Sequence, residues 1–354
     1  MTNHRVIGLM SGTSLDGLDI ICVRFSYDNT WEYQIECCTT YPYSNEWLMK
    51  LKTAPQLNEM QIKLLDLEYG VFLGEVINHF IEENKIQRAE IDIISSHGHT
   101  VFHQPEKGIT LQIGHGQSIS NLTKINVINN FRAFDVSLGG HGAPLVPIGD
   151  QLLFSEYIYC LNLGGIANIS IEEKDKVKAG DITFANMASN DIAGKKNLLY
   201  DIDGHLADSG QINTHLLNEL NELPYFHETF PKSLASEGYL NWFKPILEKH
   251  YLSVEDKLHT LGHHLCIQIK KIMKEVKSPI LITGGGVFNS FWIKNLSNLG
   301  LNIVIPDQEL VEYKEALIFA LLGVLKKENM INVLSSVTGS SSDSSSGDVF
   351  YPNS

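Results

Sequence analysis

The sequence repeats one pattern in its two halves, and this repeat constrains the fold more than any other feature. Residues 5–25 contain a short apolar run, a Gly-rich turn and a second apolar run, which is the pattern of a β-hairpin. Residues 157–172 show the same order, with the turn at Gly164 and Gly165. A repeat of this kind indicates a duplicated supersecondary unit. Each half is therefore predicted to open with a hairpin.

A helix and a further strand follow the hairpin in each half. Apolar residues at helical spacing mark the two helices: Ile62, Leu65, Tyr69, Phe72, Val76 and Phe80 in the first half, and Leu258, Leu261, Leu265, Ile269, Ile272 and Val276 in the second. The strands predicted at 91–95 and 279–283 end in polar or Gly-rich turns. Open α/β sheets bind ligands at such strand ends, so we expect the turns of both halves to face one cleft. The alternative is two ordinary α/β domains whose glycines only make tight turns.

Length and composition agree with two folded domains. A chain of 354 residues exceeds the usual size of one hydrophobic core, and we expect domains at 1–134 and 135–354. The net charge of −14 argues against a nucleic-acid partner or an anionic membrane surface. The longest apolar run, 316–325, is too short to span a bilayer, and no signal-like segment opens the sequence. These features predict a cytoplasmic protein.

The turn of the first hairpin carries groups that suit phosphate and a metal ion. Gly12, Thr13 and Ser14 offer backbone N–H groups and hydroxyls, and glycine removes the side-chain obstacle to an approaching anion. Asp16 is a hard oxygen ligand of the kind that Mg²⁺ prefers. The alternative is a hairpin turn of ordinary composition. The five cysteines show no metal-ligand spacing, and we expect them to be reduced thiols.

Short motifs occur along most of the chain. In sequence order they are 10–17; 96–100 with His103 and Pro105; 110–114; 130–132 with Asp135; 139–147; 162–168; 200–201 with Gly204, Ala207 and Gly210; and 284–286 with Asn289. Together they resemble the motifs of the anhydro-N-acetylmuramic acid kinases, in that family's order. The resemblance implies the α/β fold of the actin, heat-shock-70 and hexokinase superfamily: two duplicated actin-like (ribonuclease-H-like) domains with a central nucleotide and substrate cleft.

The resemblance also implies an activity. Enzymes of this family use ATP and water to open the 1,6-anhydro ring of N-acetylmuramic acid, and they phosphorylate O6 to give the 6-phosphate in peptidoglycan recycling. ATP and Mg²⁺ are the implied cofactors, an anhydro sugar is the implied substrate, and a homodimer is the implied assembly.

Three groups of residues are implied to bind the nucleotide. The ATP phosphates would contact the first turn, formed by Gly12, Thr13, Ser14, Leu15, Asp16, Gly17, Leu18 and Asp19, with Asp16 as the metal ligand. Gly164 and Gly165 would close on the phosphates, and Gly284, Gly285 and Gly286 would lie under the adenosine. Physical chemistry supports this division, because glycine lets a backbone amide or a nucleobase approach closely and an acid can hold the Mg²⁺ that screens the γ-phosphoryl group.

The residues implied on the sugar side are His97, Gln112, Arg132, Asp135 and Asn186. Arg132 suits the lactyl carboxylate of muramic acid, because its planar fork binds carboxylates bidentately, although a surface or hinge salt bridge is the alternative. Four histidines, His97, His99, His103 and His115, fall close together. They leave three roles open: sugar or domain-interface contact, structural hydrogen bonding, and metal binding, the last without cysteine or carboxylate partners at zinc-like intervals.

Asp181 is implied as the catalytic base. The family's motif Asp-Thr-Gly-Pro-Gly-Asn corresponds here to residues 181–186, which keep the Asp and the Asn but replace the Gly-Pro-Gly centre. An ionised carboxylate can take a proton from the water that attacks the anomeric carbon. Phe184 and Ala185 are expected to change the volume beside the sugar. A kinase of a different anhydro sugar or hexose, or a catalytically silent nucleotide-binding regulator, therefore stays open.

The C-terminal tail from about 335 is rich in serine, glycine and aspartate. This composition cannot bury enough apolar surface to order itself, so we expect a mobile segment anchored by Val349, Phe350 and Tyr351.

Overall fold

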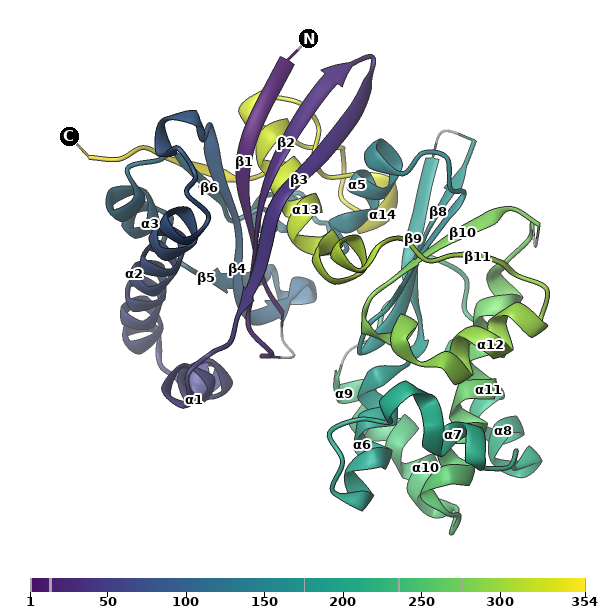
Figure 1. Ribbon diagram of the computed structural model, residues 1–354. Helices are drawn as coiled ribbons and strands as arrows, with labels where there is room; N and C mark the ends of the chain where they lie inside the picture. The colour runs from purple at the N-terminus through teal and green to yellow at the C-terminus, as the bar shows by residue number, and fades with distance from the viewer. Residues whose placement is uncertain (1, 13–14, 175, 235, 276, 354) are drawn as a thin grey trace. The chain divides into compact units, whose positions relative to one another are not determined.

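The computed structural model describes residues 2–12, 15–174, 176–234, 236–275 and 277–353, and the chain divides into two compact units. The first unit comprises Met1–Phe154 and Tyr313–Ser354, and the second comprises Ser155–Glu312. Each unit has its own β-sheet with helices packed on it (Figure 1). The prediction of two α/β domains built on one plan is confirmed by their sheets.

The sheet of the first unit has seven strands. They are β1 (Thr2–Ser11), β2 (Leu18–Asp28), β3 (Thr30–Tyr41), β4 (Ile93–Gln104), β5 (Ile109–Ile113), β6 (Val127–Asn129) and β12 (Asp348–Phe350). Their order is β12-β6-β4-β1-β2-β3, and β5 pairs with β4. β1 pairs antiparallel with β2 and parallel with β4, while β4 pairs parallel with β6.

The sheet of the second unit repeats this arrangement. Its strands are β7 (Tyr159–Leu163), β8 (Ile166–Glu173), β9 (Lys176–Phe184), β10 (Pro279–Thr283) and β11 (Asn302–Val304), in the order β11-β10-β7-β8-β9. β7 pairs antiparallel with β8 and parallel with β10, and β10 pairs parallel with β11. The strand that opens each unit thus has the same neighbours in the same directions, as a duplication requires.

Helices cover both faces of the first sheet. They are α1 (Asn45–Thr53), α2 (Glu59–Glu83), α3 (Gly116–Thr123), α4 (Ala133–Ser137), α5 (Val146–Leu153), α13 (Gln308–Lys327) and α14 (Ser335–Thr338). A capping box starts α2, because the Asn58 side chain accepts from the Gln61 N–H and the Gln61 side chain accepts in return. α13 packs on the face opposite the core of α2, and it approaches β1 so closely that a Cβ at Gly8 would lie 2.5 Å from the Ala316 carbonyl.

The helices of the second unit are α6 (Asn186–Ala193), α7 (His205–Ser209), α8 (Thr214–Asn221), α9 (Ser236–Gly238), α10 (Lys244–Lys249), α11 (Val254–Ile272) and α12 (Ser290–Asn298). α11 has Ser253 as its N-cap, acidic residues in the first turn and lysines in the last turn, all favourable for the helix dipole. Its apolar face packs on the sheet through Leu258, Leu261 and Leu265. Val276, predicted on this helix, lies outside the described residues. Among the helices of the described ranges, none has the length and apolarity that crossing a bilayer requires.

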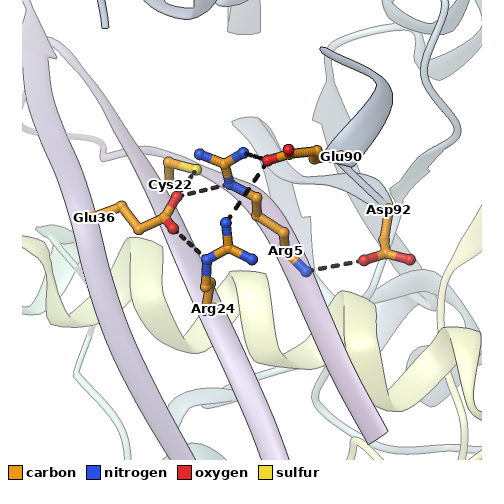
Figure 2. A network of polar contacts seen from close by, with 6 residues as sticks. All are labelled: Arg5, Cys22, Arg24, Glu36, Glu90 and Asp92. Carbon is orange, nitrogen blue, oxygen red and sulfur yellow. Dashed lines mark hydrogen bonds and ion pairs between the residues drawn. The ribbon is translucent and has the colours of Figure 1, made fainter. Parts of the chain in front are cut away.

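A polar network joins the first three strands of the first unit (Figure 2). Glu36 sits at an irregularity in the β2–β3 register and accepts from Arg5 Nε at 2.7 Å and from Arg24. Burial pushes the pKa of Glu36 up, but the hydrogen bonds from Arg24 and Arg5 outweigh it and lower the pKa. The backbone N–H of Arg5 also donates to Asp92, at 2.9 Å. Because Arg24 and Glu90 are half exposed, the network contributes modestly to stability but fixes the strand pairing locally.

The boundaries of the units differ from the expected division at 134/135. Residues 135–154 and 313–354 belong to the first unit, so its chain is discontinuous. The physical reason is packing that links α5 and α13 to the first sheet. Phe154, just after α5, contacts Tyr33 of β3 edge to face, and Asp150 of α5 forms a buried ion pair of 2.9 Å with Lys314 of α13.

The expectation of a mobile tail is wrong for the described residues, although its predicted anchor is confirmed. β12 pairs antiparallel with β6, with Val349 opposite Ile128. Upstream of β12, Asn332 exchanges hydrogen bonds with the backbone of Ser346, which is fully buried. Composition counts only apolar surface, whereas this tail is held by paired polar groups.

The buried Lys314–Asp150 pair should be important for the stability of the first unit. Lys314→Met removes the ammonium partner of a buried carboxylate and should lower the free energy of unfolding by about 3–5 kcal/mol. Urea unfolding followed by circular dichroism measures this change. The double variant Lys314→Met/Asp150→Leu should recover most of the loss. Lys63→Met, which breaks an exposed lysine ion pair on α2, should change little. If Lys314→Met and Lys63→Met lowered the free energy of unfolding equally, the buried ion pair would not have the stabilising role given to it here.

Candidate functional site

The first hairpin turn connects β1 to β2 at the carboxyl end of β1. Thr13 and Ser14 of this turn lie outside the described residues. Leu15 has a left-handed backbone (φ 62°), and its N–H donates to the Gly12 carbonyl at 3.3 Å. At Gly17 a Cβ would come within 2.8 Å of the Tyr41 carbonyl, so only glycine allows β2 to start this close to β3. The turn is therefore short and fixed at its second end.

Two carboxylates flank the end of this turn. Asp16 is exposed, whereas Asp19, on β2, is half-buried and its Oδ1 accepts from the Thr40 hydroxyl at 2.6 Å. Leu18 is buried in the core between them. The Asp16 carboxylate is thus accessible to solvent, and its role as a metal ligand stays a prediction.

A buried hydroxyl chain joins the end of β1 to β4. Ser11 Oγ lies 2.9 Å from His99 Nδ1 and 2.7 Å from the Tyr43 hydroxyl, which in turn lies 2.7 Å from the Tyr69 hydroxyl. Burial lowers the pKa of His99 to about 4, so the imidazole is neutral at physiological pH. These hydrogen-bonded hydroxyl groups hold the polar end of β4 next to the first hairpin turn.

The buried His97 and the partly buried Arg132 form another polar contact in this unit. The His97 Nδ1–H donates to the Gly98 carbonyl at 2.9 Å, and Nε2 accepts from Arg132 Nε at 3.0 Å and from Nη2 at 2.9 Å. Burial, reinforced by the Arg132 charge, holds the pKa of His97 well below its ordinary value. Arg132 Nη1 donates to the Gly142 carbonyl at 2.7 Å. Burial lowers the pKa of Arg132 to about 10, which keeps it protonated.

Asp135 is fully buried, and its carboxylate accepts hydrogen bonds from other groups of the protein. Its Oδ2 accepts from the Gly142 N–H at 2.7 Å, and its Oδ1 accepts from the Thr338 hydroxyl at 2.8 Å. A Cβ at Gly140 would lie 2.2 Å from Oδ2, so the loop wraps tightly around the carboxylate. The side chain predicted on the sugar side therefore holds together the loop at 139–142 and the C-terminal segment.

Gln112 offers an acceptor without a partner among the described residues. Its Nε2 donates to the Thr110 hydroxyl at 3.0 Å, while Oε1 is buried and makes no hydrogen bond there. The Gln112 Cβ lies 3.4 Å from the position that a Cβ on Gly98 would occupy. Gln112 is thus close to the His97–Gly98 segment. A buried acceptor of this kind is costly unless water or a ligand fills it.

The histidine cluster separates into individual structural contacts. His103 Nδ1 lies 3.2 Å from the Thr110 hydroxyl, and the His115 side chain accepts from the Ser118 N–H as the N-cap of α3. Within the described ranges, no three metal-ligating groups gather around these histidines. Structural hydrogen bonding thus accounts for the contacts of His99, His103 and His115.

In the second unit, the predicted glycines gather at one edge of the sheet. The carbonyls of Gly164 and Gly165 accept from the N–H groups of Asn186 and Met187, so the second hairpin turn contacts the start of α6. Asn186 Nδ2 donates to the Leu163 carbonyl at 3.2 Å and lies 3.8 Å from the position of a Cβ on Gly285. The second hairpin turn, the start of α6 and the loop after β10 therefore lie close together within this unit.

Gly284 must be glycine for two reasons. Its φ of +84° is left-handed, and a Cβ there would lie 2.3 Å from Asn162 Oδ1. Gly286 packs equally closely, since a Cβ would lie 2.6 Å from the Leu163 side chain. These positions let the loop after β10 lie directly against the end of β7.

Register aligns four polar side chains across this sheet. Thr283 of β10 pairs with Asn162 of β7, Asn162 pairs with Asn168 of β8, and Asn168 pairs with Asp181 of β9. The Thr283 hydroxyl is buried and has no partner among the described residues. The row lies next to the glycine turns, so Asp181 occupies the same part of the unit as Gly164 and Gly284.

The Asp181 carboxylate is half-buried, and within the described parts of the chain it has one backbone donor. Its Oδ2 accepts from the Leu234 N–H at 2.7 Å, and its own N–H donates to the Lys232 carbonyl at 2.9 Å. The Tyr225 hydroxyl donates to the Asp181 carbonyl at 2.7 Å. Burial raises the pKa of Asp181 to about 6, against the opposing hydrogen bond from Leu234. The carboxylate can therefore exchange a proton near neutral pH.

Phe184 does not lie where the sequence suggested. Its side chain is fully buried in the core of the second unit, with ring centroids 5.0–5.5 Å from those of Tyr239, Trp242 and Phe243. Ala185 is buried as well. The expectation that these residues change the volume beside the sugar is therefore not supported, because Phe184 fills space in the core.

Sequence reasoning missed several groups around these sites. Asn162, Asn168 and Thr283 belong to the polar row, and their equal distance from the strand ends is a signal that strand register could have provided. Tyr225 and the backbone of Leu234 surround Asp181, but they lie more than 40 residues away in the chain. No local pattern marks such a distant contact.

The chain is similar to proteins of a known family. The model of the family described as "Anhydro-N-acetylmuramic acid kinase" matches residues 4–352. A protein of that name from Francisella tularensis subsp. novicida is 33% identical, covering 95% of this chain and 96% of its own length. Another, from Aliivibrio fischeri, is 34% identical over 99% of both chains. Among solved structures, component A of (R)-2-hydroxyglutaryl-CoA dehydratase from Acidaminococcus fermentans matches at 11% identity, covering 90% and 96%, with a TM-score of 0.43.

Asp135 should prove to be a stabilising residue. Asp135→Asn replaces one acceptor by a donor that faces either the Gly142 N–H or the Thr338 hydroxyl, and it should lower the free energy of unfolding by about 1–3 kcal/mol. Thr338→Val removes one of the two bonds and should cost about 1 kcal/mol. Urea unfolding measures both, and limited proteolysis should show earlier cleavage after 334. Wild-type stability of Asp135→Asn would refute this role.

Proposed function

We propose that this chain, which belongs to the anhydro-N-acetylmuramic acid kinase family, opens 1,6-anhydro-N-acetylmuramic acid with water and phosphorylates the released O6. It is an ATP-dependent sugar kinase, and its product is N-acetylmuramic acid 6-phosphate, an intermediate of peptidoglycan recycling. The observation that carries the proposal is the family match over 4–352, combined with a carboxylate of suitable pKa at Asp181.

Asp181 is the proposed base. A carboxyl group with a pKa of about 6 is about 90% ionised at pH 7, and it is still basic enough to take a proton from water. The Leu234 N–H holds Oδ2, which orients the carboxylate. The deprotonated water adds to the anomeric carbon while the bond between this carbon and O6 breaks. The freed O6 can then attack the γ-phosphoryl group of ATP.

The glycine turns are the proposed ATP contacts of each unit. In the first unit the phosphates would contact the turn from Gly12 to Asp19. In the second unit they would contact Gly164 and Gly165, and the adenosine would contact Gly284–Gly286. Gly165 is exposed, and a Cβ there would have one neighbour at 3.9 Å, so a ligand can approach its backbone.

Asp16 is the proposed magnesium ligand. Its exposed carboxylate fits a hard cation, and Asp19 beside it is held by Thr40. When bound, Mg²⁺ neutralises the charge of the transferred phosphoryl group. The residues of this chain then have to hold the nucleotide and orient the water that attacks the sugar.

The sugar contacts are proposed for Arg132 and Gln112. Arg132 has five N–H groups, of which three are used by His97 and Gly142, and one on each terminal nitrogen stays available for a carboxylate. The buried Oε1 of Gln112 can accept from a sugar hydroxyl. His97 orients Arg132, and Asn186 is proposed to contact the substrate from the start of α6.

The proposal includes a cytoplasmic location, because ATP is the phosphoryl donor, and it includes a homodimer. Light scattering on the purified protein measures the assembly directly. A monomer at all concentrations would exclude the dimer without affecting the proposed reaction.

The reaction is tested with purified protein, Mg²⁺ and ATP. The sugars are 1,6-anhydro-N-acetylmuramic acid, N-acetylmuramic acid and a plain anhydrohexose, with products identified by mass. In heavy-oxygen water, the first sugar should give a 6-phosphate that carries the label at the anomeric position. A product from another sugar alone would indicate a different substrate, and ATP binding without turnover would indicate a silent nucleotide-binding protein.

Asp181→Asn should separate binding from turnover. The amide keeps an acceptor for the Leu234 N–H but cannot take a proton, so kcat should fall by about 100- to 10,000-fold while ATP binding stays intact. Asp191→Asn is the matched control: Asp191 also lies in the second unit, but it is paired with Lys244 and Tyr239. Near-normal turnover by Asp181→Asn would remove it from the mechanism.

The pH dependence follows from the raised pKa of Asp181. Activity needs the ionised form, so kcat/KM should rise as the pH increases through about 6 and then level off. Raising the pH has the opposite effect on the stability of the folded protein. Since the folded pKa of about 6 lies above the unfolded value of 3.8, the native state binds the proton more tightly, and this group's contribution to stability is lost as the pH rises from about 4 to about 6. Asp181→Asn should therefore melt at a higher temperature than the wild type at pH 7.5 and lose this difference at pH 4.

A further inference from the structure

A cluster of two histidines and a glutamate lies in the second unit, on residues outside the proposed kinase machinery. His215 and Glu219 lie one turn apart on α8, and His250 directly follows α10. One ligand atom from each of the three side chains lies within 4.8 Å of both others. Two segments that are about 30 residues apart in sequence thus direct metal-ligating groups at one point.

The local contacts are already close to a coordination geometry. His250 Nε2 lies 2.8 Å from Glu219 Oε2, and the rings of His215 and His250 have centroids 5.1 Å apart. In a tetrahedral zinc site with bonds of 2.0–2.1 Å, ligand atoms are about 3.3 Å apart. His215 is exposed, and its imidazole makes no hydrogen bond within the described part of the chain. A side-chain rotation can therefore bring its ring nitrogen from within 4.8 Å of the other two ligand atoms to the separation that a metal ion requires.

The chemical class of the ion follows from the ligands. Two imidazole nitrogens and one carboxylate oxygen suit a borderline cation such as Zn²⁺, whereas Mg²⁺ prefers oxygen ligands alone. The pocket beside the cluster is also lined by Asn218 and Glu222, which leaves room for water or a further oxygen at the fourth position. On binding, the metal would replace the proton that His250 Nε2 donates to Glu219, and this proton would pass to solvent.

Lys249 is the group that competes with the ion. Its ammonium lies 2.7 Å from Glu219 Oε1, the oxygen that does not contact His250. The lysine side chain is mostly exposed, so it can leave without breaking the core. It can also stay on Oε1 while Oε2 binds the metal.

We propose that His215, Glu219 and His250 form a site for a divalent transition-metal ion of the Zn²⁺ class, which joins α8 to the segment between α10 and α11. The site is independent of the proposed kinase reaction and of its Mg²⁺. Its role is structural, because the metal would cross-link two helical segments of one unit.

The test uses the full chain without an affinity tag, stripped of metal with a chelator. Titration with Zn²⁺ alone, measured by calorimetry, should give one ion per chain and an increase in melting temperature. Co²⁺ alone should give the intense visible absorption of a tetrahedral complex with nitrogen ligands. Absence of stoichiometric binding of either ion would overturn the proposal.

The variants assign the site. His215→Ala changes an exposed side chain and should weaken Zn²⁺ binding at least about tenfold without changing the melting temperature of the metal-free protein. Glu219→Gln and His250→Ala should also weaken it. The matched control is His79→Ala, because His79 and Glu83 have the same spacing on α2 but lack a second histidine in the described structure. Unchanged binding by His215→Ala, or an equal loss in His79→Ala, would place the ion elsewhere and refute the site.

Discussion

The pairing of the first strand of each unit determines where the candidate site residues lie. β1 and β7 each pair antiparallel with the next strand and parallel with the strand that returns after a helix. The antiparallel partner places a hairpin turn at the carboxyl end of the first strand, and the parallel partner brings a second loop to that end. In the second unit this brings the Gly164 turn and the Gly284 loop together. In the first unit it joins Ser11 to His99.

Much of this arrangement could be predicted because its signals are local. The hairpins, α2 and α11 follow from apolar periodicity and glycine turns, which the sequence displays within windows of about 20 residues. The surroundings of Asp135 and Asp181 could not be predicted in this way. Thr338 reaches Asp135 from 203 positions away, and Leu234 reaches Asp181 from 53. The unit boundary was missed for the same reason, since an ion pair between residues 150 and 314 returns the chain to its first unit.

The replaced centre of the segment at 181–186 illustrates the difference between sequence and structural context. A phenylalanine in place of a small turn residue suggests a smaller pocket, but Phe184 points into an aromatic cluster with Tyr239 and Phe243. The effect of Phe184 on the protein is therefore an effect on the packing and stability of the second unit. The turn itself keeps its contact with the glycine hairpin, because the Ala185 and Asn186 N–H groups donate to Gly165 and Gly164.

The contacts of Asp181 differ from those of three other carboxylates in this molecule. Asp150 has the ammonium of Lys314, Asp191 has Lys244 and the Tyr239 hydroxyl, and Asp135 has two donors. Among the described residues, Asp181 has only the Leu234 N–H as a donor to its side chain, and burial raises its pKa to about 6. Asp66 resembles it in part, because its side chain accepts from the Gly114 N–H and burial raises its pKa. A carboxylate kept for stability would be expected to gain a cation or a second donor, since desolvation without one costs free energy. This cost is understandable for a group that must hold its proton weakly near neutral pH and release it again in each turnover.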